Sequence, residues 1–252
     1  MTDHSEMKLG KKPNPFLAAM PRLSQHLSLK TWKPDPVVDY TNGVTDWGMM
    51  GNDTIGLCVE ASAGHAAQVW TQGNTTPYTG MITPATADII ALYSQLTGYV
   101  PGDESTDNGT VPNDMFKAWA AAPLFGCKLL ACASVALENW LNLMFAISRF
   151  GGVFYSWELP VSAQTQTVWD VVPDDGGTWG GHETFGCQYD ESTGNISVIS
   201  WGAVIPVTHA FWIKYCVEQH VVLSDIGTGM LSRGPDGLDV EALKTETESL
   251  SS

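Results

Sequence analysis

Apolar residues in the first 150 positions of the chain recur mostly at helical spacing. Between Val135 and Ser148 they fall three, four and seven residues apart, which places them on one face of a helix. These positions are Leu137, Trp140, Leu141, Met144 and Ile147. Glu60–Thr71 has few helix breakers, and Ala85–Leu96 and Met115–Ala122 have helical patterns, so we predict helices there as well.

The most apolar window of the chain is Leu129–Ile147. It contains Glu138, Asn139 and Asn142, three polar groups that a membrane-spanning helix rarely carries together. We therefore interpret this window as a buried helix and expect no membrane span.

After Gly151 and Gly152 the pattern changes to alternation with period two or to short apolar runs, which is typical of strands. The predicted strands are Val153–Glu158, Thr184–Tyr189, Ile196–Trp201, Ala210–Val217 and His220–Leu223. Helices thus precede an antiparallel sheet along the chain. This order predicts an α+β protein with two lobes.

Composition divides the chain into an arm, a body and a tail. Residues 1–36 are polar and contain five prolines, so we expect an extended polar arm. The body spans residues 37–225, mainly helical over 37–150 and mainly β over 151–225. Residues 226–252 form an acidic tail, with at most about one turn of helix.

The overall charge limits the partners that the protein can have. Apolar residues make up 44% of the 252 positions, enough for a large core, and the formal net charge is −15. Such a charge argues against nucleic acid or an anionic membrane as the main partner. The arm alone carries six basic and three acidic residues. It is either a solvated tail or a segment that docks onto an acidic subunit.

Cysteine usage and the first residues bear on location. Five cysteines are an odd number, and their spacing suggests neither a disulfide framework nor a C-x-x-C metal pair. No positively charged segment followed by an apolar one opens the chain, so we expect no signal peptide.

One of these cysteines has the surroundings of a nucleophile. In the stretch Asp46–Trp70, a turn with Gly48 and Gly51 leads to Cys58, and a predicted helix follows. Free backbone N–H groups and the positive dipole end at a helix start lower the pKa of a thiol. We therefore predict an activated Cys58.

A cysteine nucleophile also needs a base, and His182 is the strongest candidate among six histidines. It follows a Gly-rich turn in GTWGGHETFGCQYD and opens an apolar strand, which would hold its ring rigidly. His65 lies two helical turns from Cys58, about 10 Å away, so we expect it to be a packing residue. His209 and His220 in the late strands are expected to be structural.

A metal site is a weaker alternative for the same region. His182, Cys187 and Cys216 would be its ligands, but their spacing fits no zinc pattern. We therefore predict neither a metal nor a cofactor.

Together these segments resemble the papain-like cysteine peptidases, over roughly residues 37–225. The first family motif is a glutamine six residues ahead of a cysteine that opens a long helix, matched here by Asn52 and Cys58. The second is Gly-x-His at the start of a strand, matched by GGHETFGCQYD. The third is Asn-Ser-Trp-Gly at the end of a strand, matched by VISWG and followed by AFWIKYC. The order of the motifs agrees with the family.

The resemblance implies a two-lobe papain-like fold and a role for each matched residue. Cys58 would be the nucleophile and His182 the base. The Asn52 amide and the Cys58 backbone N–H would stabilise the oxyanion. Ile199 stands where the family has the asparagine that orients the histidine. Ser200, Ser197 or a main-chain carbonyl would have to replace that asparagine.

Two functions follow as expectations. The first is a hydrolase that cleaves a peptide or other amide bond through Cys58 and His182. The second is a catalytically impaired papain-like fold that acts as a structural or interaction subunit of a large assembly, such as a phage particle, contacted through its termini. This reading rests on Ile199, on Asn52 and on Val59, which replaces a usual tryptophan. A cytoplasmic or virion location suits both.

Overall fold

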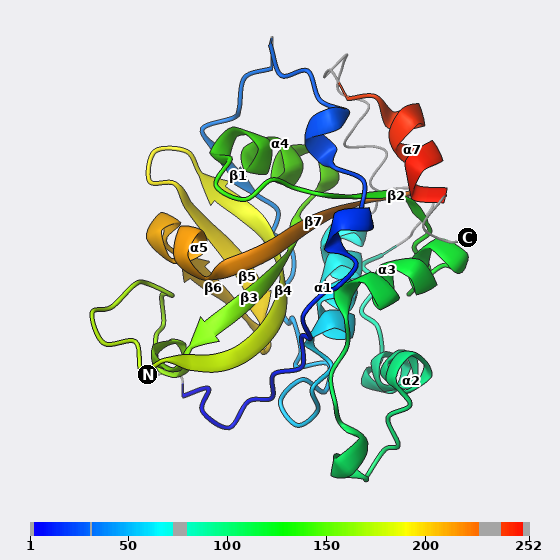
Figure 1. Cartoon of the computed structure of the whole chain (residues 1–252), viewed down its shortest axis with the longest axis vertical. Coiled ribbons are helices and arrows are strands. Elements are labelled where there is room, and N and C mark those ends of the chain that lie inside the picture. Colours follow the sequence, from blue (N-terminus) through cyan, green and yellow to red (C-terminus); the bar gives the residue numbers. More distant parts are fainter. Residues whose placement is uncertain (1–2, 31, 73–79, 227–237, 249–252) are drawn as a thin grey trace.

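One antiparallel sheet and the helix that begins at Cys58 face each other across the middle of the molecule (Figure 1). The computed structural model describes residues 3–30, 32–72, 80–226 and 238–248. The sheet has seven strands in the order β2-β7-β3-β4-β5-β6, and β1 pairs with β4. Their bounds are β1 Val37–Asp39, β2 Leu129–Ser134, β3 Val153–Pro160, β4 Thr178–Asp190, β5 Asn195–Ser200, β6 Ala203–Val207 and β7 Cys216–Ser224.

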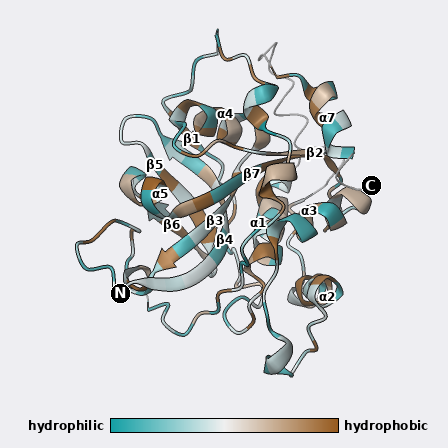
Figure 2. Ribbon diagram, in the orientation of Figure 1, coloured by the Kyte–Doolittle hydropathy of each residue, from teal (hydrophilic) through white to brown (hydrophobic). Residues whose placement is uncertain are grey.

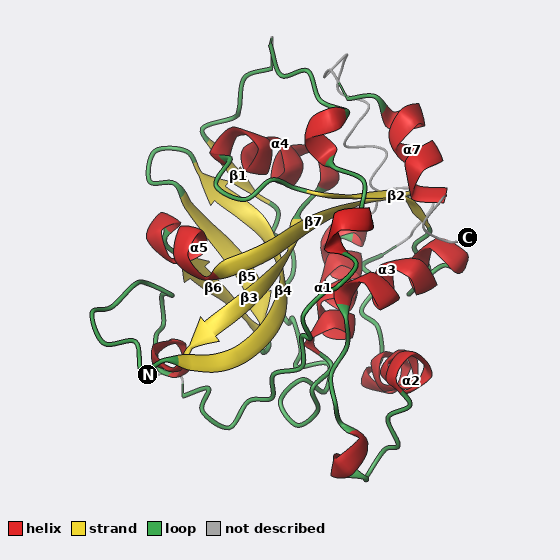
Figure 3. Ribbon diagram, viewed as in Figure 1, coloured by secondary structure: helices red, strands yellow, loops and turns green. Residues whose placement is uncertain are grey.

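The helices divide between the two lobes (Figure 3). Their bounds are α1 Cys58–Thr71, α2 Thr86–Thr97, α3 Pro112–Ala121, α4 Trp140–Phe150, α5 His209–Tyr215 and α7 Val240–Glu248. Four short 3₁₀ turns lie at Leu17–Ala19, Leu23–Gln25, Glu104–Thr106 and Val161–Gln164. This arrangement confirms the α+β class with a helical lobe that carries the Cys58 helix. Within the described residues, no helix combines the length and the apolar character needed to cross a membrane.

The two largest apolar clusters lie between the sheet and the helices. In the first, α4 and α5 pack against the sheet around buried aromatic residues such as Trp157 and Phe211. In the second, α1 and α3 pack against the sheet around Trp70, Trp119 and Phe154. The helix α1 is buried over its whole length. The helix α2 has an exposed side, and Figure 2 shows both apolar and polar residues along it.

Two predicted elements are wrong. The segment Ala210–Val217 was expected to be a strand, but α5 covers most of it and β7 begins only at Cys216. The Thr208 side chain caps this helix by accepting a hydrogen bond from the Phe211 amide, 3.2 Å away. Its aromatic residues have high strand propensity, but their burial on one helical face decides the outcome.

The apolar window Leu129–Ile147 is likewise two elements rather than one helix. Its first part is strand β2, and the helix α4 begins only at Trp140. A strand that is buried on both faces reads as a continuous apolar run, which periodicity alone cannot distinguish from a buried helix. The Asn139 side chain accepts a hydrogen bond from the Asn142 amide and marks the start of α4.

The N-terminal arm runs between the two lobes before it crosses the outside of the molecule (dark blue in Figure 1). The Lys11 amide donates to the carbonyl of Gly181 on β4, at 3.1 Å. On the other side, the Thr110 amide donates to the Gly10 carbonyl at 2.8 Å, and the Lys12 amide donates to the Thr110 carbonyl at 2.9 Å. The arm therefore bridges both lobes by backbone hydrogen bonds.

The C-terminal helix α7 has nine residues, more than the single turn that we predicted for the tail, and it packs on the outer strand β2. The hydroxyl of Thr247 accepts a hydrogen bond from the Cys132 amide at 3.0 Å. Most of the predicted acidic tail, residues 227–237 and 249–252, lies outside the described residues.

Candidate active site

Cys58 is the first residue of α1 and faces β4 of the other lobe. Its thiol is buried, and Sγ accepts a hydrogen bond from the Glu183 backbone amide at 3.4 Å. Burial raises the pKa of the thiol to about 12, against the opposing effect of the backbone amides of Glu183 and Gly10. The expected lowering of the pKa at the helix start is therefore outweighed by desolvation in this conformation.

His182 lies on β4, directly before Glu183. Its Nε2 atom is 2.7 Å from Ser200 Oγ, and its ring stacks on Trp201 with centroids 4.4 Å apart. Burial, followed by the charge of His4, lowers the pKa of the imidazole to about 3, so the ring is neutral. The Nδ1 atom is buried and has no hydrogen-bond partner among the described residues.

The fold thus brings Cys58 and His182 to the same place without pairing them. The thiol bonds to the amide of the residue that follows His182, and both groups are neutral. A buried thiolate–imidazolium pair loses the hydration of both ions, and their mutual attraction repays this cost only with good geometry and further hydrogen bonds. In the described conformation the site is assembled but uncharged.

Asn52 contacts the arm just ahead of the arm residue Gly10, which packs against Gly56. Its side-chain amide donates to the carbonyl of Ile55 in its own turn, at 3.1 Å, and to the carbonyl of Lys8 in the arm, at 3.3 Å. An amide N–H aimed at a peptide carbonyl is the kind of contact that stabilises an oxyanion.

The histidine support differs from the family motif as the sequence suggested. Among the three candidate replacements for asparagine, Ser200 takes the position, because its hydroxyl meets His182 Nε2. Ile199 points instead into the apolar cluster and lies opposite Phe185 of β4 and Val204 of β6. Val59 is buried in the same cluster.

Glycines allow the arm to pass close to Cys58. A Cβ atom on Gly10 would lie 1.7 Å from the carbonyl oxygen of Gly56, two residues before the cysteine. A Cβ on Gly109 would lie 2.1 Å from the Gly10 carbonyl oxygen, and one on Gly181 would lie 2.2 Å from the Lys11 carbonyl oxygen. The backbone of the arm packs directly on the backbone of both lobes here. A larger residue at any of these three positions would collide with the backbone that faces it.

Three buried glutamates surround this crossing, and sequence reasoning missed all of them. Burial raises the pKa of both Glu60 and Glu183 to about 8. Glu60 accepts a hydrogen bond from the Thr110 hydroxyl at 2.7 Å, and Glu183 accepts one from the Ser156 hydroxyl. Glu218 pairs with the Lys11 ammonium at 3.0 Å. The signal was present in the sequence: each glutamate interrupts an otherwise largely apolar segment.

The remaining candidates have other partners. His65 contacts Gln68 and Trp47, as a packing residue would. Cys187 is buried in the apolar cluster with Phe185, and the Cys216 thiol donates to the Glu218 carbonyl at 3.3 Å. Among the residues that the structure describes, no three His, Cys, Asp or Glu side chains are grouped as metal ligands.

Comparison with known proteins supports the fold. No family model matches the sequence, and no curated protein matches it. Procathepsin B S9 from Trypanosoma congolense superimposes with a TM-score of 0.62 at 9% identity, over 88% of each chain. The cysteine protease xylellain from Xylella fastidiosa gives 0.51 at 14% identity, over 88% of this chain and 98% of xylellain.

A third structure, digestive procathepsin L 3 of Tenebrio molitor, gives a TM-score of 0.52 at 12% identity, over 86% of this chain and 83% of its own. All three are papain-like cysteine proteases or their precursors. The chain therefore has the papain-like fold, as its three motifs implied.

Proposed function

We propose that the protein is a cysteine hydrolase that cleaves peptide bonds through Cys58, and that its arm keeps it latent in the described conformation. The observation that carries this proposal is the path of the arm. A peptide backbone passes Cys58 with one carbonyl on the Asn52 amide and its next residues hydrogen-bonded to both lobes. A cleft that binds its own chain in this way is suited to bind another extended peptide.

The proposed reaction uses the groups already in place. His182 Nδ1 takes the proton of the Cys58 thiol, and Sγ attacks the substrate carbonyl carbon to form a C–S bond. The oxyanion is held by the Asn52 amide and the Cys58 N–H. The C–N bond then breaks as the imidazolium returns its proton to the leaving amine, and water hydrolyses the thioester.

Latency has a physical cause in this proposal. With the arm in place, burial keeps the thiol and the imidazole neutral, so the attacking thiolate is scarce. Removal of residues 8–12 from the cleft would admit water, lower the desolvation cost of the ion pair and free the space beside Sγ. Two of the superimposed structures are themselves called procathepsins, which agrees with a latent form.

The test compares two charge reversals in neighbouring arm residues. Lys11→Glu places a third carboxylate beside Glu218 and Glu183 and is expected to expel the arm. Lys12→Glu is the matched control, because Lys12 is less buried and forms no ion pair within the described residues. The rate of Cys58 alkylation by iodoacetamide at neutral pH is measured by mass spectrometry, together with hydrolysis of fluorescent casein.

We expect Cys58 of the Lys11→Glu chain to be alkylated at least about tenfold faster than Cys58 of the Lys12→Glu chain, and casein to be cleaved faster by the same factor. The reason is that like charges in the buried site cost several kcal/mol and so favour release of the arm. Cys58→Ala and His182→Ala, each combined with Lys11→Glu, should abolish cleavage. Casein cleavage that survives Cys58→Ala, or equal alkylation rates in the two charge variants, would overturn the proposal.

A second candidate is a papain-like subunit that binds partners without catalysis, as in a particle assembly. The observation that favours it is the altered support of the site: a serine replaces the usual carboxamide, and Nδ1 of His182 has no hydrogen-bond partner among the described residues. Fast Cys58 alkylation in Lys11→Glu without cleavage of any peptide would favour this second function.

A further inference from the structure

The side chain of Lys11 fills a closed acidic pocket beside the candidate active site. Its ammonium group lies 3.0 Å from Glu218 Oε1, with the two side chains 3% and 6% exposed. The positive charge of Lys11 also opposes the rise in the pKa of Glu183, whose side chain is buried. A long flexible lysine on a polar arm ordinarily keeps its charge in water. Here the whole side chain is enclosed.

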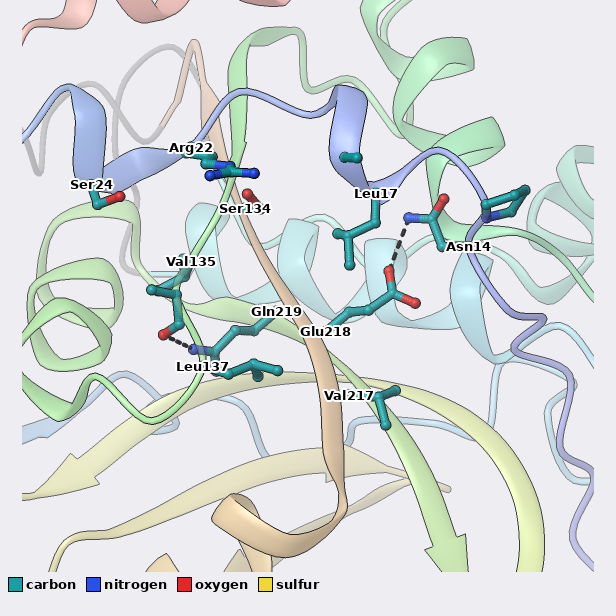
Figure 4. Close-up of a pocket in the computed structure, with 13 residues that line it drawn as sticks. Asn14, Leu17, Arg22, Ser24, Ser134, Val135, Leu137, Val217, Glu218 and Gln219 are labelled. Carbon is teal, nitrogen blue, oxygen red and sulfur yellow. Dashed lines mark hydrogen bonds between the residues drawn. The ribbon is translucent and has the colours of Figure 1, made fainter.

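The sheet builds this pocket from three adjacent strands. Ser156 on β3 lies opposite Glu183 on β4 and opposite Glu218 on β7, so the three side chains share one face of the sheet. Asn14 of the arm closes the pocket by donating to Glu218 Oε2 at 2.9 Å (Figure 4). His220, one residue pair further along β7, is kept neutral because burial lowers its pKa to about 3.

The pocket contains a buried oxygen atom that Lys11 leaves without a hydrogen bond. The Lys11 ammonium group pairs with Glu218, whereas Glu183 Oε1 is buried without a hydrogen-bond partner among the described residues. A lone ammonium is a compact charge and reaches Glu218 directly, whereas a planar guanidinium has five N–H donors in a fork. An arginine would therefore satisfy the unpaired oxygen better than Lys11 does.

We propose that this pocket recognises a lysine or arginine side chain of a peptide bound in the cleft, with arginine preferred, and that Lys11 is its intramolecular occupant. The substrate assignment rests on the proposed hydrolase function, but the cation pocket itself does not. Glu218 and Asn14 also line a cavity of about 640 Å³, which lies between arm residues and β7 (Figure 4).

The first test refills the pocket without any catalysis. In the full chain, Lys11→Ala removes the side chain, and thermal unfolding is measured with n-butylammonium, butylguanidinium or neutral n-butanol. We expect both cations, and butylguanidinium most, to raise Tm by roughly 3 °C or more at saturating concentration, because ligand that binds only the folded state stabilises it. n-Butanol should have no such effect.

The controls assign the effect to the pocket. Adding Glu218→Gln to the Lys11→Ala chain should remove the response, whereas adding Glu158→Gln, an exposed glutamate on β3, should leave it intact. If the Lys11→Ala chain does not fold alone, recovery of its near-ultraviolet circular dichroism on adding the cation becomes the measurement. An equal response to n-butanol, an equal response in the Glu218→Gln background, or no recovery with either cation would overturn the pocket.

The second test addresses the substrate. Peptidyl chloromethyl ketones that differ only in carrying arginine or norleucine are reacted with the Lys11→Glu chain, and Cys58 alkylation is followed. We expect arginine probes to react at least about tenfold faster, and Glu218→Gln to abolish that preference. Equal rates with both probes would overturn the substrate assignment. No reaction with either probe would instead count against the hydrolase, and the cation rescue would still decide the pocket.

Discussion

The core of the β lobe and the seam, by which we mean the place where the arm passes between the lobes beside Cys58, are both buried. The first is made of aromatic side chains and the second contains buried carboxyl groups. Beneath α4 and α5 the sheet buries aromatic rings, with Trp157, Trp169 and Phe211 in mutual contact. On its other side, where the arm passes Cys58, the same strands bury Glu183 and Glu218.

The difference shows how the two regions contribute. Apolar burial is favourable wherever shapes fit, so the aromatic core stabilises the fold without specifying a ligand. Buried carboxylates cost free energy unless an ion or hydrogen bond compensates them, so the seam is stable only with a suitable occupant. Variants in the two regions should therefore respond differently to partners, pH and charge.

The aromatic core should give the largest loss of stability. Trp157 is buried, and its indole N–H donates to the Thr184 hydroxyl at 2.8 Å. Trp157→Ala should lower the free energy of unfolding by about 4 kcal/mol, measured by urea denaturation. Trp179→Ala, at a half-buried tryptophan, should lose less than half as much. Similar losses at both sites would show that the core does not dominate stability.

The seam should lose less, and its loss should depend on the partner residue. Lys11→Met leaves Glu218 buried and unpaired and should cost about 3 kcal/mol in urea denaturation. Replacing both residues by methionine should recover most of that cost. The exposed Lys214–Asp175 pair is the control, and breaking it should cost about 0.5 kcal/mol or less. If the losses of the two single methionine variants at residues 11 and 218 simply added in the double variant, Lys11 and Glu218 would not stabilise each other as described.

The pH dependence of stability separates the regions further. Burial raises the pKa of Glu60 from 4.5 to about 8. The folded state thus keeps a proton that the unfolded state releases, so this stabilisation is complete below pH 4.5 and is lost as the pH rises through about 8. When the pH is raised from about 6 to about 9, the free energy of unfolding should fall less in Glu60→Gln than in the wild type. The difference between the two losses should be on the order of 2 kcal/mol.

Urea denaturation at several pH values measures this effect, with the exposed Glu158→Gln as control. Glu183 titrates in the same direction and should keep part of the slope in the Glu60→Gln chain. The buried neutral His182 acts oppositely, because its lowered pKa makes stability fall below pH 6.5. Equal slopes for wild type and Glu60→Gln above pH 6.5 would refute a protonated Glu60.

The smallest effect is expected at the support of His182. Ser200→Ala removes the hydroxyl 2.7 Å from Nε2 and should cost about 1 kcal/mol. Ser197→Ala on the same strand is the control, because no side-chain bond to His182 is lost there. The ¹⁵N shifts of the His182 ring should change in the first variant only. Unchanged shifts after Ser200→Ala would mean that another group orients the ring.

The sequence predicted the features that local patterns encode. The change from helical spacing to alternation at Gly151 indicated the α+β class, and Gly-rich turns located Cys58 and His182 at the start of a helix and near the start of a strand. The three candidate replacements for the missing asparagine could not be ranked, because the ranking depends on the register between β4 and β5 and on which β5 side chains share a face of the sheet with His182. The structure selects Ser200.

The path of the arm and the glutamates of the seam could not be predicted in the same way. Lys11 and Glu218 come from opposite ends of the chain, and no local pattern records that they meet. Polar composition and prolines suggested an extended arm, and its residues near Cys58 form backbone hydrogen bonds to both lobes. Whether such a segment lies in solvent or in a cleft depends on glycines in other elements, such as Gly56 and Gly181.

The helix α7 has a consequence for how the protein behaves at high concentration. The sheet ends at β2 and β6, and an open edge strand is a template on which other chains add and aggregate. Thr247 of α7 occupies an amide of β2, while β6 contains Pro206, which lacks an N–H and whose carbonyl is taken by the Trp169 amide. Loss of α7 would expose the edge of β2 to the addition of strands from other chains.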